Sequence, residues 1–142
     1  MTRRYAVSRH IAATPARVWR LLTDADGFSS WNDAVISLDG PIAVGRSIDL
    51  VSTADPERTF TLEVAEMTEP TRMVWTDGMP LGLFTGTRTY ELIAAGEGTD
   101  FSMVEEFTGP LAALITRFIP DLTDSFEMFA DSLVRAAAQS SA

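Results

Sequence analysis

Two long stretches of alternating residues, 84–93 and 99–108, stand close together in the sequence, with Gly96-Glu97-Gly98 between them. Alternation of this length is typical of β-strands, and a short glycine-containing connection predicts that the two strands pair as an antiparallel hairpin. Pairing about this turn places Arg88 opposite Glu105. The same register predicts three further pairs, which are Leu92 with Phe101, Tyr90 with Met103, and Gly86 with Phe107.

The paired side chains share one face of this hairpin, because residues spaced by two point the same way. That face is rich in aromatic residues, so we expect it to be the concave face of a sheet. Arg88 and Glu105 would then form a cross-strand ion pair in a largely apolar hollow, where they would orient a polar group of a ligand. The alternative is that the pair lies on the outer surface or only fixes the register of the strands.

Five other segments carry strand signals, and these are residues 4–12, 34–38, 47–53, 58–67 and 72–76. In the fourth of them, Phe60, Leu62 and Val64 alternate with polar residues and therefore share a face. A turn at Glu69-Pro70-Thr71 brings Trp75 near Val64 and onto that face. Trp75 is thus a candidate wall of the hollow, although ordinary core packing is the favoured interpretation.

Two helices are expected directly after the first strand. Thr14 can accept hydrogen bonds from free backbone N–H groups, and Pro15 suits the first helical position. A helix therefore begins there and runs to about residue 23, and a short second helix is expected over residues 28–31.

Helical signals return after the last strand. Residues 111–119 are apolar and expected to be helical, and Pro120 interrupts the helix because proline has no N–H to donate. The final helix is expected over residues 121–138, with residues 139–142 as a frayed tail. Its apolar stripe consists of residues at helical spacing, which are Leu122, Phe126, Phe129 and Leu133.

The order of these elements predicts an α+β fold. One strand, two helices, about six strands and a long helix argue for an antiparallel meander, and the long helix is the natural cover for its concave face. We expect the curved sheet to wrap around this C-terminal helix and to enclose a mostly apolar pocket. A length of 142 residues, of which 46% are hydrophobic, predicts a single domain over residues 1–142 with a sizeable core.

Charge and composition exclude several classes of function. A formal net charge of −9 disfavours nucleic acids and anionic membrane surfaces as partners. The absence of cysteine excludes disulfides, thiolate metal sites and cysteine nucleophiles. The N-terminal residues lack the apolar core of a signal peptide, and the longest apolar stretch is too short to span a bilayer. We expect a cytoplasmic protein that is a monomer or a homodimer.

Few residues carry the pattern of a catalytic or metal centre. His10 is the only histidine, so a multi-histidine metal site is excluded, and an ordinary strand position is expected for it. Asp24, Asp26 and Asp33 lie around a helix end, where capping and solvation are the favoured roles and a weak metal site is the alternative. The sequence has no G-x-S-x-G motif and no glycine-rich phosphate loop. We therefore expect neither a metal nor an organic cofactor.

Several motifs occur in a characteristic order along the chain. They are IAATPARVW at residues 11–19, then Thr23-Asp24, Trp31, Gly45, Pro70 before Trp75, Gly86-x-Arg88-x-Tyr90, and Thr99-x-Phe101-x-Met103-x-Glu105-x-Phe107-x-Gly109. In this order and spacing, over nearly the whole chain, the sequence resembles the START-like (SRPBCC) superfamily. The resemblance is greatest to its polyketide cyclase/dehydrase-like branch.

This resemblance implies a helix-grip fold with a cavity between the sheet and the C-terminal helix. Members bind lipids, hormones, polyketides or other apolar molecules, and some are aromatases or cyclases. Many relatives carry histidine where this chain has Arg88, and some carry another where it has Met103, whereas Glu105 keeps the pattern. A permanent cation thus replaces an acid–base imidazole, so proton transfer by histidine does not carry over. The segment of residues 111–120 is longer and more apolar than the resemblance leads us to expect. It would form either a lid over the mouth of the pocket or an extra turn of packing.

Three functions follow, in order of preference. The first is binding of a small hydrophobic molecule whose anionic or carbonyl group pairs with Arg88, while Glu105 holds the guanidinium. The second is a cyclase, aromatase or dehydratase that acts on a poly-β-ketone, with Arg88 stabilising an enolate and Tyr90 or Glu105 moving a proton. The third is a co-chaperone-like interaction module that docks through residues 111–119. The candidate ligand-binding residues are Trp31, Phe60, Leu62, Trp75, Arg88, Tyr90, Met103, Glu105, Phe107, Phe126 and Phe129.

Overall fold

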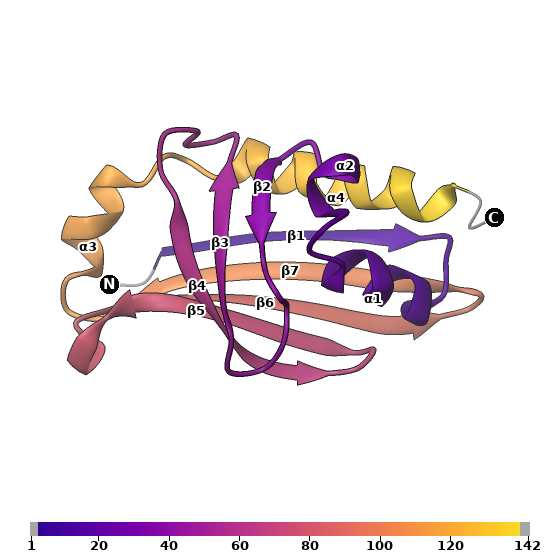
Figure 1. The fold of residues 1–142 in the computed structure, drawn as a ribbon, viewed down its shortest axis with the longest axis horizontal. Helices are drawn as coiled ribbons and strands as arrows, with labels where there is room; N and C mark the ends of the chain where they lie inside the picture. The colour runs from indigo at the N-terminus through magenta and orange to yellow at the C-terminus, as the bar shows by residue number, and fades with distance from the viewer. Residues whose placement is uncertain (1–2, 140–142) are drawn as a thin grey trace.

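The structure is a computed structural model that describes residues 3–139. Within these residues, seven antiparallel strands form one curled sheet in the order β1-β7-β6-β5-β4-β3-β2 (Figure 1). The first and last strands of the chain therefore pair with each other. The strands are β1 (Arg3–Ile11), β2 (Val35–Asp39), β3 (Ser47–Ser52), β4 (Phe60–Thr68), β5 (Arg72–Met79), β6 (Phe84–Ala95) and β7 (Gly98–Thr108).

The long helix α4 (Thr123–Ala138) lies along β1 on the concave side of the sheet (Figure 1). The other helical segments are α1 (Pro15–Thr23), α2 (Phe28–Trp31), the 3₁₀ turn η1 (Pro80–Gly82), α3 (Ala112–Ile115) and the 3₁₀ turn η2 (Thr116–Phe118). This arrangement confirms the predicted helix-grip fold, with two short helices after the first strand. Among residues 3–139, no helix is both long enough and apolar enough to cross a membrane.

The beginning of α1 and the end of α4 are tied together by one side chain. Thr14 caps α1 as predicted, because its hydroxyl accepts a hydrogen bond from the backbone N–H of Arg17 at 3.3 Å. The guanidinium of Arg17 donates to the carbonyl oxygens of Ala136, Ala137 and Gln139 at 3.3, 3.1 and 2.7 Å. The Ala136 carbonyl also accepts from the backbone N–H of Gln139 at 3.3 Å, and Arg17 supplies donors to these carbonyls at the end of the helix and so holds α4 against α1.

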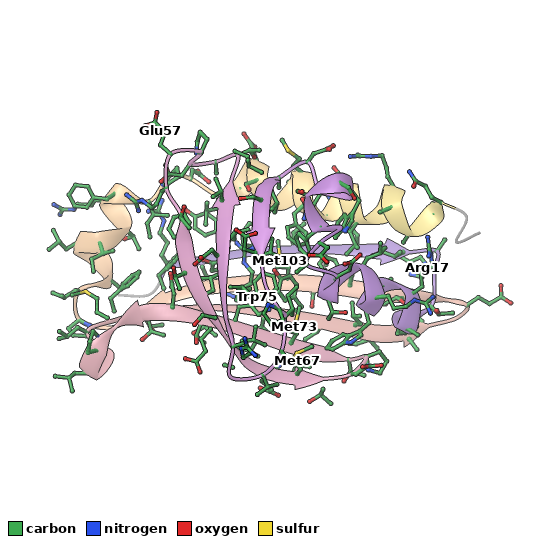
Figure 2. All side chains as sticks on the ribbon, in the orientation of Figure 1. Arg17, Glu57, Met67, Met73, Trp75 and Met103 are labelled. Carbon is green, nitrogen blue, oxygen red and sulfur yellow. The ribbon has the colours of Figure 1, made fainter. Side chains whose placement is uncertain are left out.

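The concave face of the sheet meets the apolar stripe of α4. Tyr90, Leu92, Phe101 and Met103 are buried on the sheet side, as the predicted hairpin requires. The residues of α4 that are buried against them include Phe126, Phe129 and Leu133. Figure 2 shows Trp75 and Met103 in this interior, and Glu57 on the loop between β3 and β4 at the outside of the molecule.

Most strand ends lie within two residues of the expected positions, and the larger differences are in β5, the segment after β7 and the start of α4. β5 continues to Met79, beyond the predicted end at residue 76. Residues 111–119 do not form one helix, because α3 gives way to the 3₁₀ turn η2 after a single turn. The helix α4 begins at Thr123, since the carboxylate of Asp121 accepts hydrogen bonds from its backbone N–H and hydroxyl at 2.9 and 2.7 Å. The predicted tail at residues 139–142 lies, beyond Gln139, outside the described residues.

Candidate functional site

A cavity of about 350 Å³ lies between the sheet and a roof that is made by α3, η2 and the start of α4. Its floor is mostly apolar and comes from five neighbouring strands, β3 to β7. The floor residues with apolar side chains are Leu50, Phe60, Leu62, Trp75, Phe84 and Phe107. The roof residues are Ile115, Phe118, Ile119, Pro120, Leu122 and Ser125. An apolar hollow of this size suits a small molecule.

Arg88 and Glu105 form the predicted ion pair on this floor. They stand opposite each other in the β6–β7 register, and the Arg88 Nε donates to Glu105 Oε1 at 2.6 Å. Both side chains are 15% exposed, and the guanidinium carbon lies 5.0 Å from the centre of the Phe126 ring. Burial acts to lower the pKa of Arg88, but Glu105 and Tyr90 outweigh it and raise that pKa above its ordinary value. Arg88 is therefore a permanent cation.

Asp77 is a third charged group on the same floor, and it was not among the residues predicted from the sequence. It lies on β5, two residues after Trp75, and it pairs in register with Gly86 of β6. A Cβ atom at Gly86 would come within 2.6 Å of Asp77 Oδ1, so the glycine leaves the space that this carboxylate occupies. Burial and the negative charge of Glu105 raise the pKa of Asp77 to about 6, while Arg88 opposes them.

The charges around the cavity do not make it cationic. At its edge, Arg58 Nε lies 3.4 Å from Asp55 Oδ2 on the loop before β4. The lining thus contains the carboxylates of Asp55, Asp77 and Glu105 but only the guanidinium groups of Arg58 and Arg88. When all of them are ionised, one negative charge is in excess.

The cavity lies further toward the roof than predicted. Of the candidate ligand-binding residues, those that line it are Phe60, Leu62, Trp75, Arg88, Glu105 and Phe107. Those absent from its lining are Trp31, Tyr90, Met103, Phe126 and Phe129. Under the middle of α4, aromatic side chains fill the space: Phe129 lies 5.9 Å from the Tyr90 ring and 6.0 Å from the Trp31 ring. A void of only about 20 Å³ remains there, lined by Arg88, Met103, Phe126 and Phe129 among others.

Tyr90 is a poor candidate for proton transfer. Its side chain is fully buried and packs on Trp75, with 4.9 Å between the ring centres. Burial raises the pKa of Tyr90 to about 12, although Arg88 acts in the opposite direction. The phenol therefore keeps its proton at neutral pH.

The remaining candidates for chemistry lie away from the cavity. His10 is exposed on β1, where its Nδ1 lies 2.8 Å from Asp100 Oδ1 of β7. Asp24 accepts from the backbone N–H of Gly27, and Asp33 pairs with Arg135. Over residues 3–139, no three His, Asp or Glu side chains come together as a metal ion would require.

The position of Asp77 had a readable signal in the sequence. Trp75 and Asp77 are spaced by two, so they share a face if the strand continues, but the predicted strand ended at residue 76. The structure shows Gly78 still paired in β5, opposite Thr85. The roof had no comparable signal, because its position depends on how residues 111–120 fold back over the sheet.

The comparisons with known proteins agree with this architecture. A family model described as polyketide cyclase / dehydrase and lipid transport matches residues 2–139. The chain belongs to this family. No curated protein matches the sequence.

Solved structures show the same fold at low sequence identity. The Zhui aromatase/cyclase from Streptomyces sp. R1128 is similar with a TM-score of 0.72 and 12% identity, over 96% of this chain and 94% of that one. Norcoclaurine synthase from Thalictrum flavum gives a TM-score of 0.71 and 12% identity, over 99% and 96%. A protein from Thermus thermophilus gives 0.69 and 24%, over 96% and 100%. At these identities the likeness establishes the fold alone.

Proposed function

We propose that this protein binds a small hydrophobic molecule in the roofed cavity. The observation that carries this proposal is a hollow of about 350 Å³ with aromatic walls and a single group of buried charges at one place on its floor. The apolar walls would bury the body of the ligand, while Arg88 and Asp77 would fix the orientation of its polar end. Membership of a family that is described by lipid transport as well as cyclase chemistry supports this function.

The test uses pyrene, a neutral hydrocarbon that probes the apolar walls and none of the charges. Binding is measured by fluorescence titration, and we expect one pyrene per chain. Ser125→Trp places an indole in the cavity and should abolish this binding, because Ser125 lines the roof. Met128→Trp is the matched control on the same helix, since Met128 is 40% exposed, and it should bind as the unaltered protein does. Undiminished binding by Ser125→Trp would show that pyrene lies elsewhere and would refute the proposal.

A second candidate is cyclisation of a poly-β-ketone, and the joint presence of Asp77 and Arg88 favours it. The carboxylate of Asp77 would accept a proton from a carbon between two carbonyl groups, and Arg88 would stabilise the enolate oxygen that forms. Attack of that carbon on another carbonyl of the same chain would close the ring, and the proton would return to the new alkoxide. The aromatase/cyclase among the structural neighbours is consistent with such a reaction.

Product analysis after incubation with a poly-β-ketone distinguishes this reaction from binding alone. Asp77→Asn should lower the cyclisation rate by about a hundredfold or more, the scale of general base catalysis. The same product yield with and without the protein would leave binding as the function.

A further inference from the structure

The two charged groups on the cavity floor offer opposite hydrogen-bonding abilities to a ligand. Arg88 donates from Nε to Glu105, and the Tyr90 hydroxyl lies near enough to the guanidinium to raise its pKa, but within residues 3–139 neither terminal nitrogen of Arg88 meets an acceptor in hydrogen-bonding geometry. Its terminal N–H groups are therefore donors for an oxygen of a ligand. The Asp77 carboxylate receives no hydrogen bond from any residue in the described range, although it is half-buried. It is an acceptor without a donor.

A charged ligand group would meet repulsion at this place. A carboxylate that approached Arg88 would be repelled by Asp77 and Glu105. The free energy needed to remove it from water there would exceed its attraction to the single guanidinium. An ammonium group that approached Asp77 would face Arg88, whose charge is close enough to affect the pKa of Asp77. A neutral hydroxyl avoids both penalties, because its hydrogen can go to Asp77 while its oxygen accepts from Arg88.

We propose that the ligand of this cavity is a hydrophobic alcohol or phenol whose hydroxyl group donates to Asp77 and accepts from Arg88. This inference rests on the proposed function and names the ligand class for the same site. It departs from the anionic or carbonyl group that the sequence alone favoured. Asp77 is thus the residue that determines specificity, and a partly desolvated carboxylate without a donor gains most from such a partner.

The test compares three probes with the same aromatic body: naphthylethanol, naphthylethylamine and naphthylacetate. Isothermal titration at pH 7.5 should rank naphthylethanol first for the unaltered protein, by about tenfold or more over each charged probe. In Asp77→Asn, naphthylethanol should lose affinity and naphthylacetate should gain it, because the repelling charge is gone. Glu63→Gln removes the same charge from an exposed position on β4, and it should leave the ranking unchanged.

Two results would overturn the inference. The first is that naphthylacetate or naphthylethylamine binds as tightly as naphthylethanol. This comparison uses the unaltered protein alone, so it does not depend on whether a variant folds. The other is an unchanged ranking in Asp77→Asn. Pyrene binding reports in parallel whether the cavity itself is intact in each protein. Pyrene binding with the wrong ranking refutes the hydroxyl ligand alone, whereas failure of pyrene to bind refutes the proposed function and this inference with it.

Discussion

Asp77 illustrates how one side chain can be favourable for function and costly for folding. Its carboxylate lies beside Gly86 on the cavity floor, where burial and Glu105 both disfavour the ionised form. Arg88 offsets only part of this effect, because the guanidinium is already paired with Glu105. A residue held in such a place is more useful for contact with a ligand than for the stability of the fold.

Replacement of Asp77 by asparagine should therefore stabilise the protein at neutral pH. The pKa of Asp77 is raised from 3.8 to about 6, so between these values the folded protein holds a proton that the unfolded chain has lost. The contribution of Asp77 to the free energy of unfolding therefore falls as the pH rises between these two values. At higher pH the full loss is present. Asp77→Asn should gain about 1–3 kcal/mol at pH 7.5 after allowance for partial exposure, and almost none of that at pH 3.5.

Urea denaturation of both proteins at the two pH values measures this difference. Carboxylates remote from Asp77 affect both proteins alike and cancel in the comparison. Glu63→Gln again serves as a control, and its effect on the free energy of unfolding should be close to zero at both values. A destabilised Asp77→Asn at pH 7.5 would mean that the carboxylate is stabilised in the folded protein, contrary to this account.

At the scale of elements, the hairpins were predictable because turn chemistry and side-chain alternation fix register without knowledge of the rest of the fold. The turn after Ala95 set every pair of β6 and β7, including Arg88 with Glu105. The pairing of Val64 with Trp75 was also confirmed, although a bulge between Val64 and Glu66 shifts the register beyond it. Such a bulge leaves little trace in the sequence, since the extra residue changes the pattern by a single position.

The roof was harder to predict, because its residues satisfy no single periodicity. Residues 111–119 are mostly apolar and were predicted as a helix for that reason, but Leu114 and Phe118 are 52% and 69% exposed. The chain makes a single turn of α3 and then a 3₁₀ turn, which Arg3 fixes by donating from its guanidinium to the carbonyl of Thr116 at 3.0 Å. A contact between residues so far apart in sequence cannot be read from local pattern.

At the scale of the whole molecule, the sheet and helix divide the interior into two regions. Under the centre of α4, Tyr90, Met103 and Phe129 fill the space as a core, and toward α3 the cavity stays open beside Gly86. The sequence predicted which residues face inward, because alternation decides that. The sequence could not predict which of these residues line the cavity, because that depends on where residues 111–120 pack over the sheet.

This division predicts an uneven pattern of amide hydrogen exchange. Exchange should be slowest in β6 and β7, which pair along their whole lengths and are covered by the core. It should be much faster in α3 and η2, which are four and three residues long and carry exposed apolar side chains. Such short segments open easily, because few hydrogen bonds and contacts must break.

Saturating pyrene should then slow exchange chiefly in the roof. A ligand that binds only the closed form stabilises that form by mass action, so roof amides should exchange about tenfold or more slowly, while those of β2 at the far edge of the sheet should not change. Mass spectrometry after deuterium labelling measures both, and Ser125→Trp, in which the cavity is filled, should show no such effect. Slowing spread evenly over all elements would indicate global stabilisation, and unchanged roof amides would mean that residues 111–120 do not close over the ligand.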